Sequence, residues 1–244
     1  LRTLGVPVVQ DLPGVGENLR DHPMVITLFQ TRPGLLDDRS PVLQAGLRFT
    51  AEGSATRNDL YIIPISVASE RGSAFASAPG SVIGTGIGLA LENASSAGVL
   101  RLAAADPHAQ PLLNYRYLSD PGDRARMRYG LRVLIRLSQH PAYAALLQSR
   151  LSPTEADLAS DPALDAWLLA HATTQHHSSG TCKMGPATDP MAVVDQYCRV
   201  HGLEGLRVVD ASVMPDVVRA NTNATTIMIA ERVADWLRAA GREG

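Results

Sequence analysis

The chain has 244 residues, of which 45% are hydrophobic and 19% are charged, and its formal net charge is −2. This composition is typical of a globular protein and excludes the disordered and fibrous classes. A net charge this close to zero gives no field that would attract nucleic acid or an anionic membrane surface, so we expect neither as a partner. No apolar run approaches the roughly 20 residues that span a bilayer, and we expect a soluble, cytoplasmic protein.

The chain opens on Leu1, without an initiator Met, and its first residues are neither a signal peptide nor a targeting helix. We therefore expect a fragment, or one piece of a cleaved polypeptide. Cys182 and Cys198 are too few for a disulfide scaffold and have no partner at zinc-ligand spacing. We expect two reduced thiols and no metal site.

Several segments of the first half predict strands. Residues 3–12 form a short β-prone run that Pro7 restricts to a sheet edge or a strand start. Further along, apolar runs of β-branched residues alternate with turn residues, which favours strands over helices. These strands are expected at residues 24–30, 60–67, 81–91, 98–102 and 111–117. Their connections are too short for helical crossovers, so we expect antiparallel pairing.

Residues 13–19 are rich in Gly and Asn and predict a tight loop. The Gly-x-Gly in this loop is too short to be a dinucleotide fingerprint. The full Gly-x-Gly-x-x-Gly after a strand occurs nowhere in the sequence. The chain therefore has no cofactor-phosphate loop that can be assigned from its sequence.

The first of three predicted helices opens at Asp120 and Pro121, and its apolar residues have the spacing of a core-facing stripe. The stripe consists of Met127, Leu131, Leu134 and Ile135. A second helix is expected from about Thr154, because residues 152–155 carry helix-start signals. Its apolar face would be formed by Leu164, Trp167 and Leu168.

The third helix is expected over residues 224–238. Its apolar side would comprise Ile227, Ala230, Val233, Ala234 and Leu237. Between the second and third helices, residues 206–210 predict a compact buried strand that ends in an acid.

Four stretches carry a recognisable pattern, and they follow one another in a fixed order. They are residues 11–23 (DLPGVGENLRDHP), 99–118, 176–185 (HHSSGTCKMG) and the closing segments 205–215 and 221–231. Together they resemble the carboxyl-terminal half of the glucose-methanol-choline (GMC) family of flavin-dependent oxidoreductases, which includes alcohol dehydrogenases, alcohol oxidases and choline dehydrogenase-like members. The resemblance covers nearly the whole chain.

The resemblance implies an α+β fold, with a mostly antiparallel substrate-domain sheet with helices and carboxyl-terminal elements that complete a Rossmann-like FAD domain. Residues 1–23 would be a loop associated with the flavin domain, 24–185 the substrate-binding domain and 186–244 the carboxyl-terminal part of the FAD-binding domain. The Rossmann half would be supplied by another chain or a missing segment. The expected partner is therefore an amino-terminal FAD-binding half, and the expected cofactor is FAD.

His177 lies immediately before x-x-Gly-Thr and matches the active-site histidine of the family. Alcohol oxidation needs the hydroxyl proton removed as hydride leaves carbon for flavin N5, and imidazole has a suitable pKa. An isolated histidine is more often structural, but within this motif we expect a general base. His176 stands where relatives often carry an aromatic residue, and we expect its ring to pack beside the flavin.

Asn223 matches the second active-site position of the family, which hydrogen-bonds the substrate oxygen. The alternative is an ordinary N-cap, because a convincing helix begins at Ala224. Both readings stay open, and family position favours the active site.

The resemblance also implies flavin contacts. Asp210 and Ala211 would contact the ribityl and pyrophosphate region, with a turn cap as the alternative for Asp210. The start of the third helix would direct a partial positive charge of about half a unit at the flavin pyrimidine. Further cofactor contacts are expected from Asn221, Thr222 and Thr225.

The expected reaction is therefore the oxidation of an alcohol to a carbonyl compound by hydride transfer to FAD, with His177 as the base. Two alternatives stay open. One is hydroxynitrile lyase chemistry, which retains FAD without net redox, and the other is a noncatalytic fragment that folds only as a structural partner. The alcohol and the electron acceptor are not specified by these motifs.

Overall fold

The computed structural model describes residues 1–35, 41–69, 72–73 and 82–240. The chain forms two compact units, and each is assembled from separate segments. The first unit comprises Leu1–His22, Ser96–Tyr117 and His176–Gly244, and the second comprises Pro23–Ser95 and Leu118–Gln175. Residues 96–117 and 176–185 thus group with the two ends of the chain. The assignment of segments to a flavin domain or a substrate domain stays a prediction.

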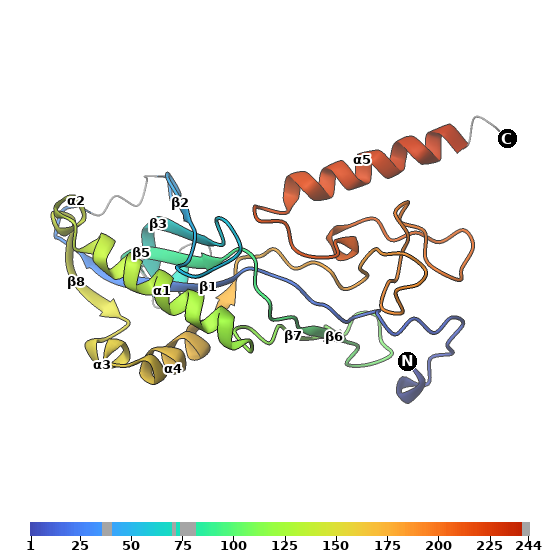
Figure 1. The fold of residues 1–244 in the computed structure, drawn as a ribbon, viewed down its shortest axis with the longest axis horizontal. Coiled ribbons are helices and arrows are strands. Elements are labelled where there is room, and N and C mark those ends of the chain that lie inside the picture. Colours follow the sequence, from blue (N-terminus) through green and yellow to red (C-terminus); the bar gives the residue numbers. More distant parts are fainter. Residues whose placement is uncertain (36–40, 70–71, 74–81, 241–244) are drawn as a thin grey trace. The chain divides into compact units, whose positions relative to one another are not determined.

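An antiparallel sheet organises the second unit. Its strands are β1 (Pro23–Thr31), β2 (Leu47–Phe49), β3 (Leu60–Ser69), β4 (Gly72–Ser73), β5 (Val82–Leu91), β8 (Leu147–Ser152) and β9 (Thr173–Thr174). Their main order is β2-β3-β5-β1-β8, with β4 paired to β3 and β9 paired to β1 (Figure 1). The predicted strands at 24–30 and 60–67 are confirmed, and so is the strand at 81–91, apart from Ser81, which lies outside the described residues. The predicted antiparallel pairing is confirmed as well.

The core of this unit lies along β3 and β5. Leu60 pairs with Leu91, and Ile62 pairs with Leu89. These four side chains are buried to within 1% of full burial. A strand buried in this way is a nearly continuous apolar run, as the sequence of β5 is.

Helix α1 (Pro121–Ser138) packs on the sheet, against β3 and β5 (Figure 1). The Asp120 side chain accepts hydrogen bonds from the backbone N–H groups of Gly122 and Asp123, and Pro121 occupies the first turn, so the helix starts as predicted. The buried residues Met127, Leu131 and Leu134 confirm the predicted stripe, whereas Ile135 is only half-buried.

Close approach of α1 to the sheet depends on Gly130. A Cβ atom at this position would lie 2.9 Å from Leu89 Cδ1 and 3.0 Å from Leu60 Cδ1. A larger residue would therefore push the helix away from the core.

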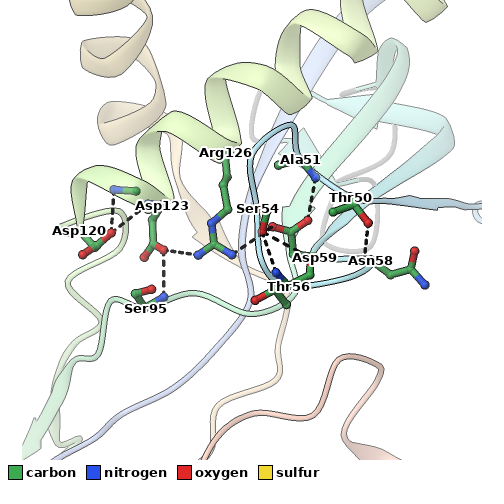
Figure 2. Close-up of polar contacts among 11 residues, drawn as sticks. Thr50, Ala51, Ser54, Thr56, Asn58, Asp59, Ser95, Asp120, Asp123 and Arg126 are labelled. Carbon is green, nitrogen blue, oxygen red and sulfur yellow. Dashed lines mark hydrogen bonds and ion pairs between the residues drawn. The ribbon is translucent and has the colours of Figure 1, made fainter.

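A buried polar network also ties α1 to the sheet (Figure 2). Arg126 donates from Nη1 to Asp59 Oδ2 at 3.2 Å and from Nη2 to Asp123 Oδ1 at 2.6 Å. Asp59 further accepts from Ala51 N at 2.9 Å, and Asp123 accepts from Ser95 N at 2.9 Å. One guanidinium thus joins the loop before β3, the end of β5 and the first turns of α1.

The helix predicted from Thr154 is two helices in the structure, α3 (Glu155–Leu158) and α4 (Asp161–His171). The Ser160 side chain caps α4 by accepting from Ala163 N, and Pro162 in the first turn of α4 cannot continue the hydrogen bonds of α3. The predicted apolar face of Leu164, Trp167 and Leu168 is buried, as expected. A further short helix, α2 (Pro141–Ala144), precedes β8.

The first unit has less regular structure. It holds the hairpin of β6 (Val99–Arg101) and β7 (Leu112–Asn114), the 3-10 helices Arg2–Leu4 and Ala211–Val213, and α5 (Asn223–Ala240), which is drawn in red in Figure 1. The hairpin confirms the strands predicted at 98–102 and 111–117. The strand predicted at 3–12 is wrong, because the chain forms a 3-10 helix there and then a loop.

The buried strand predicted at 206–210 is also wrong. Arg207 forms only an isolated bridge with Arg199, and Leu206 is 50% exposed. The segment returns along residues 198–200 through a turn, with Val200 N donating to Leu206 O and Val208 N donating to Cys198 O. Residues 206–208 therefore form backbone hydrogen bonds with the loop at 198–200 and are not a buried strand of a sheet.

Helix α5 forms where it was predicted, and Val233 is buried as expected, but other residues of the predicted apolar side are not. Ile229, Val233 and Trp236 pack on an apolar cluster of this unit. The cluster contains Val193, Val194, Cys198, Val200 and Val213. Ile227 and Leu237, which were expected to face the core, are 54% and 53% exposed. Within the part of the chain that the structure describes, no helix combines the length and apolar character that crossing a membrane requires.

Candidate active site around His177

The predicted tight loop at 13–19 lies against the segment that follows His177. Arg20 N donates to Ser179 O and Ser179 N donates to Arg20 O, both at 2.9 Å. Gly16 N donates to Thr181 O at 2.9 Å. Two of the four stretches identified in the sequence are therefore hydrogen-bonded to each other.

Gly180 is required where these two segments meet. Its φ of +84° lies in the left-handed region, and a Cβ atom there would lie 2.5 Å from Asn18 O. Asn18 Nδ2 in turn donates to Gly180 O at 3.2 Å and to Pro215 O at 3.1 Å. The Gly of the x-x-Gly-Thr motif thus allows three backbone segments to approach one another closely.

His177 is paired with a second histidine, His22. The two Nδ1 atoms lie 3.0 Å apart, and the rings meet edge to face with their centroids 5.0 Å apart. His22 Nε2 lies 2.9 Å from Val218 O. His22 is 0% exposed and His177 is 8% exposed, so the pair is held inside the first unit.

Asp21 fixes the backbone beside both rings. Its Oδ1 accepts from His22 N at 2.8 Å and from His177 N at 3.0 Å. Its Oδ2 accepts from the Tyr117 hydroxyl at 2.6 Å. One buried carboxylate therefore sets the relative positions of two segments that are far apart in the sequence.

Two tyrosines from the segment after β7 support this arrangement. Tyr115 and Tyr117 stack with their ring centroids 4.8 Å apart and an interplanar angle of 13°. The Tyr115 hydroxyl lies 2.8 Å from Ser178 Oγ. The tyrosines thereby hold Ser178, which follows His177, and Asp21, which accepts from the His177 backbone N–H.

His176 adopts a left-handed backbone conformation with φ of +66°. This conformation is uncommon for residues other than Gly and is costly, although histidine is among the side chains that tolerate it best. The side chain is exposed. Its predicted packing beside a flavin stays a prediction.

Asp210 and Ala211 lie close to the same motif. Asp210 Oδ1 accepts from Ser212 N at 2.7 Å and caps the 3-10 helix, as the alternative interpretation of this residue expected. Ala211 O accepts from Gly180 N at 3.2 Å. Their proposed contact with a cofactor stays a prediction.

The remaining predicted site residues surround the start of α5, in the same unit as His177. Asn223 is exposed and is the first residue of the helix, so it lies within the first turn and not before it. Thr222 O accepts from both Thr226 N and Thr226 Oγ1 at 2.9 Å. Asn221 is exposed and Thr225 is half-buried.

Three residues of this arrangement had no predicted role, namely Asp21, His22 and Tyr117. Asp21 and His22 were noticed only as part of the 11–23 stretch. No local pattern indicates that His22 meets His177, because 155 residues separate them. The burial of the polar residues Asp21 and His22 is visible only once the chain is folded.

The residues present fit a flavin in two respects. The Ser179 hydroxyl is buried and has no hydrogen-bond partner among the described residues, which leaves a polar group beside the His177 motif for a bound group to satisfy. The first turn of α5 contains no acidic residue. Its partial positive charge is thus not neutralised by its own side chains and suits an anionic ring.

Comparison with known proteins identifies relatives of this chain. The family model described as GMC oxidoreductase matches residues 94–230. Oxygen-dependent choline dehydrogenases of Cronobacter sakazakii and Klebsiella pneumoniae subsp. pneumoniae are 35% and 36% identical to the chain, over 98% of its length and 46% of theirs. The chain therefore spans about half the length of these relatives.

Solved structures resemble the whole chain. Pyridoxine 4-oxidase from Mesorbium loti matches with a TM-score of 0.85 and 26% identity, over 98% of this chain and 46% of the other. Formate oxidase from Aspergillus oryzae matches with a TM-score of 0.83 and 23% identity, over 99% of this chain and 50% of the other. The second likeness supports the fold alone.

Proposed function

The chain belongs to the GMC oxidoreductase family, and on this premise we propose that the complete protein oxidises an alcohol to a carbonyl compound with FAD as its cofactor. The observation that carries the proposal is the position of His177. Its ring contacts His22 at 3.0 Å, and its backbone N–H donates to the buried Asp21 carboxylate at 3.0 Å. A histidine whose ring and backbone are both held in place is suited to act as a general base.

Each catalytic side chain has a separate role in this proposal. His177 removes the proton from the substrate hydroxyl, while the amide of Asn223 donates a hydrogen bond to the substrate oxygen and orients it. Bound FAD would supply the hydride acceptor. The task of the protein is thus to hold the alcohol and to take its proton.

We propose that FAD is held by His176, Asp210, Ala211, Asn221, Thr222 and Thr225. The absence of acidic residues from the first turn of α5 supports this assignment, because the helix start then favours a negatively charged ring. The buried Ser179 hydroxyl offers one further polar group beside His177.

We also propose an amino-terminal FAD-binding half as the partner of this chain, either as a separate chain or as a segment of the same precursor. Relatives extend well beyond the matched region, since the match covers 46% of them. Exposed apolar residues of α5, namely Ile227, Met228 and Leu237, are residues that such a half would cover. In this scheme residues 1–23 and 186–244 contribute to the FAD-binding domain and residues 24–185 form the substrate-binding domain.

The proposal is tested with the full-length protein carrying FAD, mixed without oxygen with a panel of primary and secondary alcohols. Choline heads the panel, because relatives that are 35% and 36% identical are named for it. At least one alcohol should bleach the flavin absorbance stoichiometrically. Cleavage of a hydroxynitrile without bleaching would indicate lyase chemistry, and the absence of both reactions would indicate a noncatalytic protein.

The role of His177 is tested by His177→Ala in the same protein. Loss of a general base should slow flavin reduction by about 10²- to 10⁴-fold while the FAD content stays the same. His108→Ala, at an exposed turn of the same unit, is the control and should reduce its flavin at the parental rate. Parental flavin reduction in His177→Ala would exclude His177 as the base.

A further inference from the structure

We propose that His22 is a positioning residue that fixes the tautomer of His177, so that Nε2 of His177 is the atom that receives the substrate proton. This inference rests on the proposed function and adds to it the identity of the accepting atom. It follows from two contacts of the His22 ring and from its burial.

The first step concerns the proton on His22 Nε2. This atom lies 2.9 Å from the backbone oxygen of Val218. A carbonyl oxygen only accepts hydrogen bonds, so His22 Nε2 must carry the proton that this contact requires. A neutral His22 then has no proton on Nδ1.

The second step transfers this constraint to His177. The unprotonated His22 Nδ1 is an acceptor and lies 3.0 Å from His177 Nδ1. Two unprotonated nitrogens at this distance would place their lone pairs against each other, so His177 Nδ1 carries a proton and donates it. Neutral His177 consequently has a lone pair on Nε2, which is what a general base needs.

A charged His22 would produce the opposite arrangement. It would donate from both nitrogens, and a neutral His177 would then hold its proton on Nε2, where it could not receive another. His22 is fully buried, and charging a buried imidazole is costly. This burial favours the neutral form of His22.

The arrangement also serves the state that follows proton transfer. The O–H bond of the alcohol breaks, its proton forms an N–H bond at His177 Nε2, and His177 becomes an imidazolium. Its Nδ1–H continues to donate to His22, and this hydrogen bond becomes charge-assisted and stronger. His22 itself keeps its proton on Nε2 and its contact with Val218 O, so the ring orientation is retained through the step.

Neutron diffraction tests the tautomer directly. Crystals of the full-length, FAD-containing protein would be exchanged into D2O at about pH 8, where an ordinary histidine is neutral. We expect deuterium on His22 Nε2 and His177 Nδ1, and none on His177 Nε2. Deuterium on His177 Nε2 with a bare Nδ1, or on both nitrogens of His22, would overturn the inference. The result does not depend on any alcohol being oxidised, so it stands apart from a failure of the proposed function.

Two substitutions of His22 test its effect on the reaction. His22→Leu removes the acceptor and should slow flavin reduction by about 10- to 100-fold, as when a partner that orients a functional imidazole is lost. His22→Asn can place an amide oxygen near the former Nδ1 and should recover a large part of that rate. Melting temperatures of both variants are measured alongside. Equal rates in the two variants, or a parental rate in His22→Leu, would show that His22 does not position the base.

Discussion

The Arg126 guanidinium lies 3.2 Å from the carboxylate of Asp59, which is fully buried in the second unit (Figure 2). Arg126 itself is 14% exposed and also pairs with the buried Asp123, three residues before it on α1. Removing this cation would leave two buried carboxylates without their shared counter-charge.

Arg126→Met should therefore destabilise the protein strongly. Breaking a buried ion pair by removing one partner costs about 3–5 kcal/mol of unfolding free energy, because the remaining charge is buried and uncompensated. Arg238→Met is a matched control, since Arg238 pairs with Asp235 at the same spacing on α5 but both side chains are more than 60% exposed. The midpoints of urea denaturation should fall markedly for Arg126→Met and hardly for Arg238→Met. Similar midpoints for the two variants would contradict the importance of this network.

Gly180→Ala tests the close approach of Gly180, three residues after His177, to the backbone of Asn18. The added Cβ atom would lie 2.5 Å from Asn18 O in a backbone conformation with φ of +84°. A residue held in that region costs about 1–3 kcal/mol, and relief of the clash requires the segment next to His177 to move. We expect both a lower melting temperature and slower flavin reduction. Gly53→Ala is a control for the conformational cost, because φ is +75° there and a Cβ atom would meet nothing within 4 Å.

Asn223→Asp distinguishes the two interpretations of Asn223. An acid in the first turn of α5 interacts favourably with the helix dipole, so stability should stay the same or rise by about 0.3–1 kcal/mol. If Asn223 orients the substrate, loss of the amide donor should slow flavin reduction. The added negative charge should also shift the pH profile to higher pH, because it stabilises the protonated base.

Asn221→Asp is the matched control for that substitution, since Asn221 is exposed and lies just before the helix. An unchanged rate in Asn223→Asp, together with unchanged or higher stability, would limit Asn223 to a structural role at the helix start.

The reactivity of Cys182 should reflect its surroundings. Burial raises the pKa of the Cys182 thiol above its usual value, so the thiol is protonated and unreactive at neutral pH. Alkylation by iodoacetamide should be slow in the native protein and should keep increasing at pH values where the rate for an ordinary thiol has levelled off. Mass spectrometry of peptides after timed alkylation measures this. Cys182→Ala should retain the parental rate of flavin reduction. A large decrease in that rate would show that the thiol takes part in the reaction, which its burial does not predict.

Local signals in the sequence were sufficient for much of the fold. The start of α1 was predicted from Asp120 and Pro121 because a cap acts on neighbouring residues only. The strands around Leu60 and Leu89 were predicted because a fully buried strand is apolar along its length. By contrast, β8 is a polar edge strand in which only Leu147 is buried, and no pattern marked it.

The predictions that were wrong or missing concern contacts between segments that are distant in the sequence. Helix α5 has apolar residues on more than one side, and the loop residues that cover Val233 decide which side packs. In the same way, His177 was recognisable within its motif, whereas the role of His22 depends on a contact across 155 residues. A single sequence carries little information about such pairings, because they are set by tertiary packing.

The division of the chain into interleaved segments has a consequence for biosynthesis. The second unit is complete once residue Gln175 has been made, whereas the first unit also needs residues 176–244. Domains fold as units while the chain emerges from the ribosome. The sheet around β5 can therefore form before residues 176–244 are made, whereas Leu1–His22 and Ser96–Tyr117 can complete their packing only afterwards. His22 is therefore synthesised 155 residues before His177 and meets it only after the intervening second unit has been made. Slow translation between these two histidines would extend the period in which the first unit is open to chaperones and proteases.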